Sequence, residues 1–92
     1  MNKFNAGKLY SFINPHKLKY FYYQSDPRID MHENSTEGYI SINDMECVLM
    51  LEFFCYKNSN YIKFLAPSGL ICFTIIGSQH NFGSYFKEVV ES

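Results

Sequence analysis

Cysteine and histidine are the residues of this chain whose chemistry could serve catalysis or metal binding. A cysteine nucleophile needs a polar, partly exposed site beside a base, and a zinc site needs ligands at short spacings such as CxxC or HxxxH. Neither pattern occurs among Cys47, Cys55, Cys72, His16, His32 and His80. Cys72 and His80 are the only pair close enough in sequence to consider. We therefore expect no active-site thiol and no metal.

The glycines and carboxylates show no other catalytic pattern. The five glycines form neither GxGxxG nor GxxxxGK, the loops that bind phosphate groups at a helix N-terminus. Carboxylate pairs such as Asp30 with Glu33, or Asp44 with Glu46, fall in a polar segment where nothing favours a role as general acid. We therefore predict a protein that is not an enzyme and has no cofactor.

Length and composition indicate one small domain. The chain has 92 residues, of which 47% are hydrophobic and 18% aromatic, and this suffices for one densely packed core. Three cysteines in apolar runs are typical of free thiols in a reducing compartment. No apolar run is long enough for a signal peptide or a membrane span. We expect a soluble, cytoplasmic protein without membrane contact.

Residues 47–76 carry the clearest pattern of secondary structure. Three β-prone runs with alternating apolar residues are separated by the turn-forming stretches KNSN (57–60) and PSG (67–69). This pattern predicts a three-strand antiparallel meander with one apolar face. The side chains that we expect on this face are those at odd positions in 47–55, then Ile62, Phe64, Ile71, Phe73 and Ile75, with Lys63 and Thr74 opposite.

The flanking segments predict shorter elements. Short β-prone runs occupy 7–13 (GKLYSFI) and 18–24 (LKYFYYQ), and residues 25–44 form a long polar segment rich in turn formers. Residues 77–85 (GSQHNFGSY) predict a compact turn or a single 3₁₀ turn. The run FKEVV (86–90) predicts a closing strand.

This order of elements resembles that of SH3-like barrels. The segment KLYSF (8–12) is similar to the ALYDY segment of those domains, and GSYFKEV (83–89) is similar to their PSNYV segment. The resemblance implies a mainly β fold: a small SH3-like barrel of five to six antiparallel strands, with a long polar loop and a one-turn 3₁₀ connector, over residues 1–92.

The same resemblance implies an aromatic shelf for proline-rich peptides at Tyr10, Phe12 and Tyr85. The chain departs from the peptide-binding pattern because it has no Trp and carries Ser11 at the acidic position of ALYDY. Its Tyr-, Phe- and Asn-rich composition also resembles that of small accessory proteins of large bacteriophages.

Charge and aromatic residues point to a surface that binds another protein. Residues 1–23 carry four lysines and no acid, whereas residues 24–56 carry seven acids and one arginine. The four consecutive aromatics 20–23 cannot all enter one core, so two of them must face outward. We predict a phage-type effector or inhibitor that binds a protein with a basic surface through Tyr10, Phe12, Tyr20, Tyr22, Asp26, Asp30, Glu33, Glu37 and Tyr85.

Two other functions fit the composition. Lysines interleaved with aromatics could bind nucleic acid by stacking and charge neutralisation, although a net charge of −1 opposes a polyanion. The residues for this role are Lys8, Lys17, Lys19, Tyr20, Tyr22, Lys57 and Lys63. The chain could also be a structural subunit of a larger particle or a homo-oligomer, with contacts through Phe54, Tyr56 or Tyr61.

Overall fold

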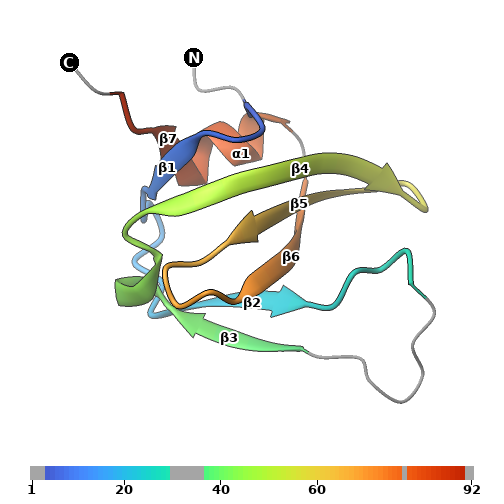
Figure 1. Ribbon diagram of the computed structural model, residues 1–92, viewed down its shortest axis with the longest axis horizontal. Helices are drawn as coiled ribbons and strands as arrows, with labels where there is room; N and C mark the ends of the chain where they lie inside the picture. The colour runs from blue at the N-terminus through green and yellow to red at the C-terminus, as the bar shows by residue number, and fades with distance from the viewer. Residues whose placement is uncertain (1–3, 30–36, 78, 91–92) are drawn as a thin grey trace.

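The computed structural model describes residues 4–29, 37–77 and 79–90, and this part of the chain is mainly β (Figure 1). It contains seven strands, one 3₁₀ turn and one short α-helix. In chain order these are β1 (Leu9–Phe12), β2 (Tyr20–Gln24), β3 (Glu37–Ser41), η1 (Ile42–Met45), β4 (Val48–Tyr56), β5 (Ser59–Leu65), β6 (Ile71–Ile76), α1 (Gln79–Tyr85) and β7 (Phe86–Glu88).

The strands form one antiparallel sheet in the order β3-β2-β6-β5-β4-β1-β7. Strands β4, β5 and β6 are the predicted meander. The turn between β4 and β5 consists of Lys57 and Asn58, both with positive φ, as a two-residue hairpin turn of the primed type requires. Gly69, with φ of 93°, belongs to the turn before β6. The meander and both of its turns are therefore confirmed.

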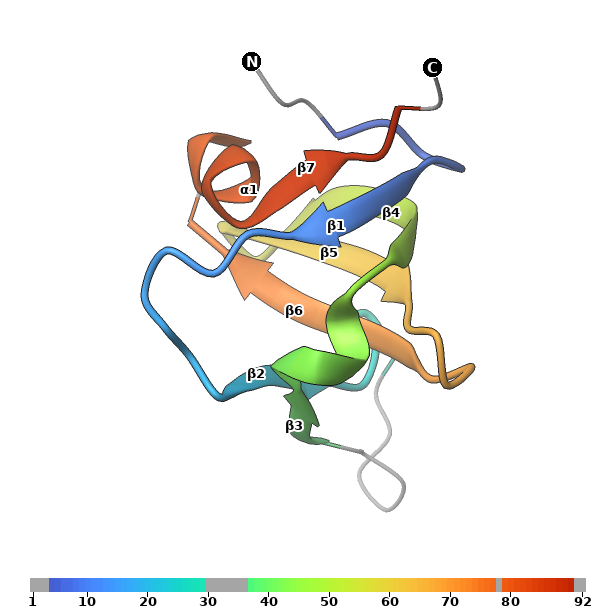
Figure 2. The ribbon, with the colours of Figure 1, turned by 90° about the vertical axis from the view of Figure 1, so that its left-hand side faces the viewer.

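The sheet is not closed, so the predicted SH3-like barrel of five to six strands is wrong in closure and in strand count. Within the described residues, β3 and β7 each pair on one side only. Strand β1 pairs with β4 and β7, whereas β2, the next strand in the chain, pairs with β6 and β3. Figure 2 shows β1 and β7 at one end of the curved sheet and β2 and β3 at the other. Because β3 and β7 do not pair with each other, the sheet keeps two free edges within the described residues.

The core lies on the inner face of this curved sheet and is dominated by aromatic rings. The ring of Phe82, on α1, lies 5.2 Å from those of Tyr10 and Phe86 between centroids. Large aromatic side chains each bury roughly 150–250 Å², which is how a short chain obtains enough buried apolar area. The largest fully buried side chains are Tyr10, Met45, Val48, Met50, Ile62, Phe64, Cys72, Phe82 and Phe86.

Two connecting segments differ from the expected ones. Residues 77–85, expected to be a compact or 3₁₀ turn, contain the α-helix α1. Its Phe82 is buried against the equally buried Phe86, the first residue of β7, and this contact anchors the helix to the core. The polar segment 25–44 contains β3 and the 3₁₀ turn η1. The buried Ile40 and Met45 anchor these two elements to the core, and burial outweighs the polar character of their neighbours.

The facing of two strands is also corrected. In β4 the inward residues are Val48 and Met50, and a register shift between Met50 and Glu52 then turns Phe53 toward the core. Such a bulge inserts one residue and inverts the alternation, which strict period-two reading misses. Ile62 and Phe64 of β5 are fully buried, as predicted.

In β6 the inner face carries Cys72, Thr74 and Ile76, whereas Ile71 and Ile75 are about half exposed. Thr74 is accepted inside because its hydroxyl donates a hydrogen bond of 2.9 Å to the main-chain oxygen of Tyr22. This bond also ties β6 to β2. The prediction that Thr74 faces away from the core was therefore wrong.

Candidate functional site

The outer face of β2 and β3 carries a group of exposed tyrosines. Tyr22 and Tyr39 are paired directly across the two strands, and their rings lie 5.5 Å apart at 67°. Their sequence neighbours Phe21 and Ile40 point into the core, so strand alternation sends the tyrosines to solvent. Tyr20, Tyr22 and Tyr39 are 60%, 38% and 70% exposed. We call Tyr20, Tyr22, Tyr39, Leu18 and Ile75 the tyrosine face.

The tyrosine face is hollowed. A depression of ≈ 330 Å³ lies between β2, the end of β6 and α1, and it is lined by all five members of the tyrosine face together with Tyr85 and Asn81. Leu18 is 37% exposed and Ile75 is 53% exposed, so apolar side chains surround the aromatic rings. Concave surfaces with aromatic and apolar walls and a few polar groups are typical of binding sites.

Tyr22 is the most constrained of the exposed tyrosines. Its hydroxyl donates a hydrogen bond of 2.7 Å to the carboxylate of Glu37 on β3. This bond to the carboxylate raises the pKa of Tyr22 above its ordinary value. With Tyr39 against its ring and Thr74 bonded to its main chain, Tyr22 is held in one orientation. Such preorganisation lowers the entropic cost of binding.

The structure places the predicted site residues in three environments. Tyr20 and Tyr22 are exposed, as expected from the aromatic run, and Glu37 lies beside Tyr22. Tyr10 is fully buried, with its hydroxyl oxygen accepting a hydrogen bond from the main-chain N–H of Asn5, so its expected place on a surface shelf was wrong. The alternation of β1 sends its ring inward. Asp30 and Glu33 lie outside the described residues.

Phe12 and Tyr85 are half-buried and stack on each other with ring centroids 6.1 Å apart. Phe21 lies edge-on to both rings, at 5.4 and 6.0 Å, which links this pair to the core. Tyr85 also borders the hollow of the tyrosine face. The shelf implied by the SH3 resemblance is therefore divided: Tyr10 is internal, Phe12 supports the core, and Tyr85 reaches the candidate site.

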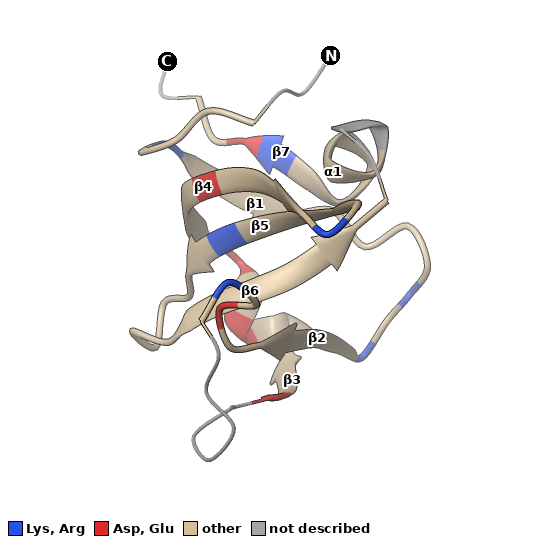
Figure 3. Ribbon diagram, turned by 90° about the vertical axis from the view of Figure 1, so that its right-hand side faces the viewer, with Lys and Arg blue, Asp and Glu red and all other residues tan. Residues whose placement is uncertain are grey.

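Asp26 belongs to a local ion-pair network. Arg28 donates to Asp26 and, through two nitrogens at 2.8 and 3.0 Å, to Glu52 on β4. These hydrogen bonds hold the pKa values of both carboxyl groups below their usual range. Figure 3 shows basic and acidic residues interspersed over this side of the molecule. The described acids thus do not form a uniform field.

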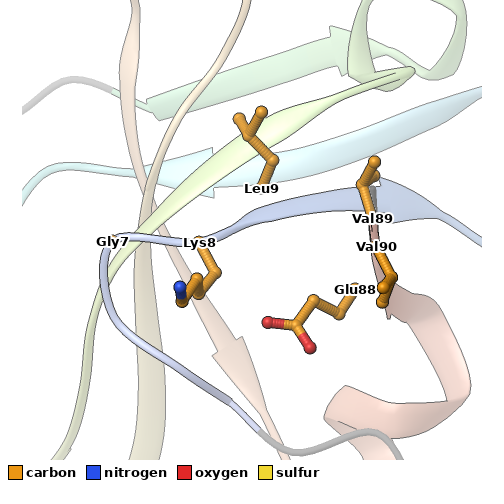
Figure 4. A pocket seen from close by; sticks show the side chains of 6 residues that line it. All are labelled: Gly7, Lys8, Leu9, Glu88, Val89 and Val90. Carbon is orange, nitrogen blue, oxygen red and sulfur yellow. The ribbon is translucent and has the colours of Figure 1, made fainter. Parts of the chain in front are cut away.

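Two other hollows are less suited to recognition. One, of ≈ 410 Å³, lies beside the end of β2 and is lined by Ile29, Leu70, Ile71, Phe73 and Lys63 together with residues 23–26, of which Tyr23 is partly buried. The other, of ≈ 400 Å³, lies where the start of β1 meets the end of β7 and is lined by Gly7, Lys8, Leu9, Glu88, Val89 and Val90 (Figure 4). In Figure 4 the charged ends of Lys8 and Glu88 lie on the same side of β1, and Leu9 points to the other side. Neither hollow contains an exposed aromatic group like that of the tyrosine face.

The described residues form neither a reactive cysteine site nor a cluster of metal ligands. All three cysteines are free, and burial raises the pKa of the Cys72 thiol to about 11, so it stays protonated near neutrality. Cys55 is exposed rather than turned inward. No group of three or more His, Cys, Asp or Glu gathers at metal-binding distance in the described ranges, which leave out His32 and the side chain of His80. None of the described helices has the length and hydropathy for crossing a bilayer.

Sequence reasoning missed three members of the tyrosine face. Tyr39 lies in GYIS, where an inward Ile40 beside an outward Tyr39 is the alternation of a strand. The surrounding polar residues suggested a loop instead, so this signal was missed. Leu18 and Ile75 join the site only through the pairing of distant strands. No protein family, no curated protein and no solved structure shows a significant match to this chain.

Proposed function

We propose that this chain is a protein-binding module without enzymatic activity and that the tyrosine face is its binding site. The observation that carries the proposal is the exposure of Tyr20, Tyr22 and Tyr39 on one preorganised, concave sheet face. Tyrosine supplies a large contact area at a low entropic cost, and aromatic residues dominate binding energy at protein interfaces.

The partner that fits this face presents apolar side chains flanked by a basic group. Apolar side chains would enter the hollow between Leu18, Tyr22 and Ile75. The carboxylate of Glu37, exposed at the rim and bonded to Tyr22, would accept a Lys or Arg side chain. We further propose that the chain is a cytoplasmic phage-type effector or inhibitor. Identification of the partner protein tests this more specific role.

Affinity capture with matched variants tests the proposal. The immobilised chain, its Tyr20→Ser/Tyr39→Ser variant and its Val90→Ser variant are exposed to lysate of the native source, and retained proteins are identified by mass spectrometry. Val90 is 76% exposed and lies two residues after β7, so its substitution controls for general loss of apolar surface. A protein retained by the wild type and the Val90 variant, and lost from the tyrosine variant, is the expected result. Capture that is indifferent to the tyrosines contradicts the proposal.

Nucleic-acid binding is the second candidate, favoured by one observation. Lys19 borders a depression shared with Tyr20, and Lys17 lies on the same connection before β2, so two cations adjoin an exposed ring. Lys63 does not extend this patch, because it lies over Phe73 near Asp26 and Glu52. Fluorescence anisotropy with labelled single-stranded and double-stranded oligonucleotides at low salt tests this candidate, and an unchanged signal eliminates it.

The third candidate function, a structural subunit of a larger particle, was based on exposed Phe54, Tyr56 or Tyr61, and two of these residues are covered within the chain. Tyr61 is only 8% exposed because Phe54 stacks on it with ring centroids 5.4 Å apart. Phe54 in turn is covered by the guanidinium of Arg28. These two residues are therefore occupied within the chain.

A further inference from the structure

Within the described residues, strand β3 has a free edge whose main-chain groups are available for pairing. The N–H of Ile42 donates to the oxygen of Lys19 at 3.1 Å, and this pair continues the β2–β3 register. In an antiparallel ladder, direct hydrogen bonds join every second residue pair. The bonded pairs are therefore Ile40 with Phe21 and Gly38 with Tyr23. The main-chain N–H groups of Glu37, Tyr39 and Ser41 consequently point away from β2, toward an edge that no described residue pairs with.

The two edges of the sheet differ in their protection. Natural edge strands are usually guarded by lysine, proline, bulges or very short length. Strand β7 has three residues and carries Lys87 and Glu88. Strand β3 has five residues, its only charged residue is the terminal Glu37, and its central Tyr39 is 70% exposed. The edge of β3 is thus the one that an added strand can use.

We propose that β3 pairs with β3 of a second copy of this chain, antiparallel, about a two-fold axis at Tyr39. In this register Tyr39 opposes Tyr39 of the other copy, and Glu37 opposes Ser41. Like charges do not meet, since the two Glu37 side chains lie ~13 Å apart along the strands. On the inner side, the position without a side chain, Gly38, opposes Ile40 of the other copy.

This pairing satisfies the free edge of both copies at once. About four main-chain hydrogen bonds form from the N–H groups of Tyr39 and Ser41 of the two chains. The paired Tyr22 and Tyr39 rings of each copy would become one continuous row across the joined sheets. The contact area of one strand pair is small, which makes this dimer weak and dependent on concentration. The inference does not rest on partner binding by the tyrosine face, and Tyr39 belongs to both proposed contacts.

Ser41 allows a test that leaves the fold intact. Its φ of −64° matches the value that proline imposes, and the preceding residue is in a strand, as proline requires. Ser41→Pro therefore removes the side-chain hydroxyl and an N–H that β2 does not use, and Ser41→Ala removes the same hydroxyl but keeps the N–H. Circular dichroism and thermal unfolding of both variants check that they remain folded.

Sedimentation velocity of the full chain from about 10 µM to about 1 mM is the decisive measurement. The wild type and Ser41→Ala should pass from monomer to dimer, and Ser41→Pro should weaken the dimer about tenfold or more. A wild type that is monomeric throughout, or a Ser41→Pro dimer as tight as that of Ser41→Ala, overturns the proposal. If the chain is strictly monomeric, the partner for the β3 edge would instead be an extended segment of a different protein.

Charged substitutions of Tyr39, at the two-fold axis, test the dimer without the use of Ser41→Pro. Tyr39→Glu and Tyr39→Lys each place like charges opposite each other and should abolish the dimer, whereas a mixture of the two variants should form heterodimers. Association of either variant alone as strongly as the wild type, or a mixture no more associated than its components, contradicts pairing at Tyr39.

Discussion

The guanidinium carbon of Arg28 lies 3.8 Å from the centroid of the Phe54 ring, so a residue following β2 covers an aromatic ring on β4. The same guanidinium bonds Asp26 and Glu52. The segment 25–29 is thereby fastened across the outer face of the sheet. Residues 25–29 of the predicted acidic docking loop therefore support the sheet, and Asp26 is already matched by Arg28.

This support should make stability depend on acidity. The pKa values of Asp26 and Glu52 are lowered by their bonds to Arg28, so their contribution to stability is present above the unfolded-state pKa of about 4 and is lost as pH falls through the folded-state values. In urea titrations at pH 7 and pH 3, Arg28→Met should show a smaller fall in unfolding midpoint between the two conditions than the wild type. Lys87→Met, which removes an exposed cation on β7, is the control. Equal falls for wild type and Arg28→Met would refute the role of Arg28.

The hydroxyl of Thr74 should contribute more to the free energy of unfolding than its methyl group does. Thr74→Val leaves the main-chain oxygen of Tyr22 without its 2.9 Å donor and should lower the free energy of unfolding by about 1–3 kcal/mol. Thr74→Ser keeps the donor and should lower it by about 1 kcal/mol. Urea denaturation followed by tyrosine fluorescence measures both, and a Val variant as stable as the wild type would exclude this bond as a link between β2 and β6.

Phe86 should be indispensable to the core. Its fully buried ring lies within 6.0 Å of the rings of Phe12, Phe21, Phe64 and Phe82 between centroids. Phe86→Ala should cost about 3–5 kcal/mol, a large share of the total stability of a small domain. Val90→Ala should change stability by less than about 0.5 kcal/mol. Thermal unfolding by circular dichroism compares them, and similar midpoints would contradict the position of Phe86.

The turn between β4 and β5 should respond to backbone conformation alone. Asn58 has φ of 64°, a region that alanine enters at a cost of about 1–2 kcal/mol and glycine enters freely. Asn58→Ala should therefore lower the unfolding free energy by about 1 kcal/mol, and Asn58→Gly should not. Equilibrium denaturation of the two variants side by side checks the sign, and an Ala variant more stable than the Gly variant would argue against the turn.

The meander was predictable because its signals are local. Alternation of apolar residues and the turn formers at 57–60 and 67–69 define β4, β5 and β6 without reference to the rest of the chain. The inward side of β4 and β6 was not predictable. Both strands are apolar on both faces, and a bulge after Met50 in one case and a bonded Thr74 in the other decide which face is buried.

The candidate site was predictable only in part. The run 20–23 shows that some aromatic rings must be exposed, and the structure identifies Tyr20 and Tyr22 as the exposed pair. Tyr39 and Ile75 come from segments far from this run, and only pairing of β2 with β3 and β6 brings them together. Tyr10 was predicted to be exposed and is buried. This error arose because β1 has only four residues, too few to establish from the sequence which side of the strand is buried.

Site-specific photo-crosslinking tests the tyrosine face as a protein-binding site most directly. Benzoylphenylalanine is placed at position 39, on the face, and in a second sample at position 90, which is equally exposed but remote from the face. After irradiation in lysate of the native source, position 39 should give a discrete product with one protein other than a second copy of this chain, suppressed by excess unlabelled wild type, and position 90 should not. Absence of any product at position 39, or the same products at both positions, would contradict the proposed function.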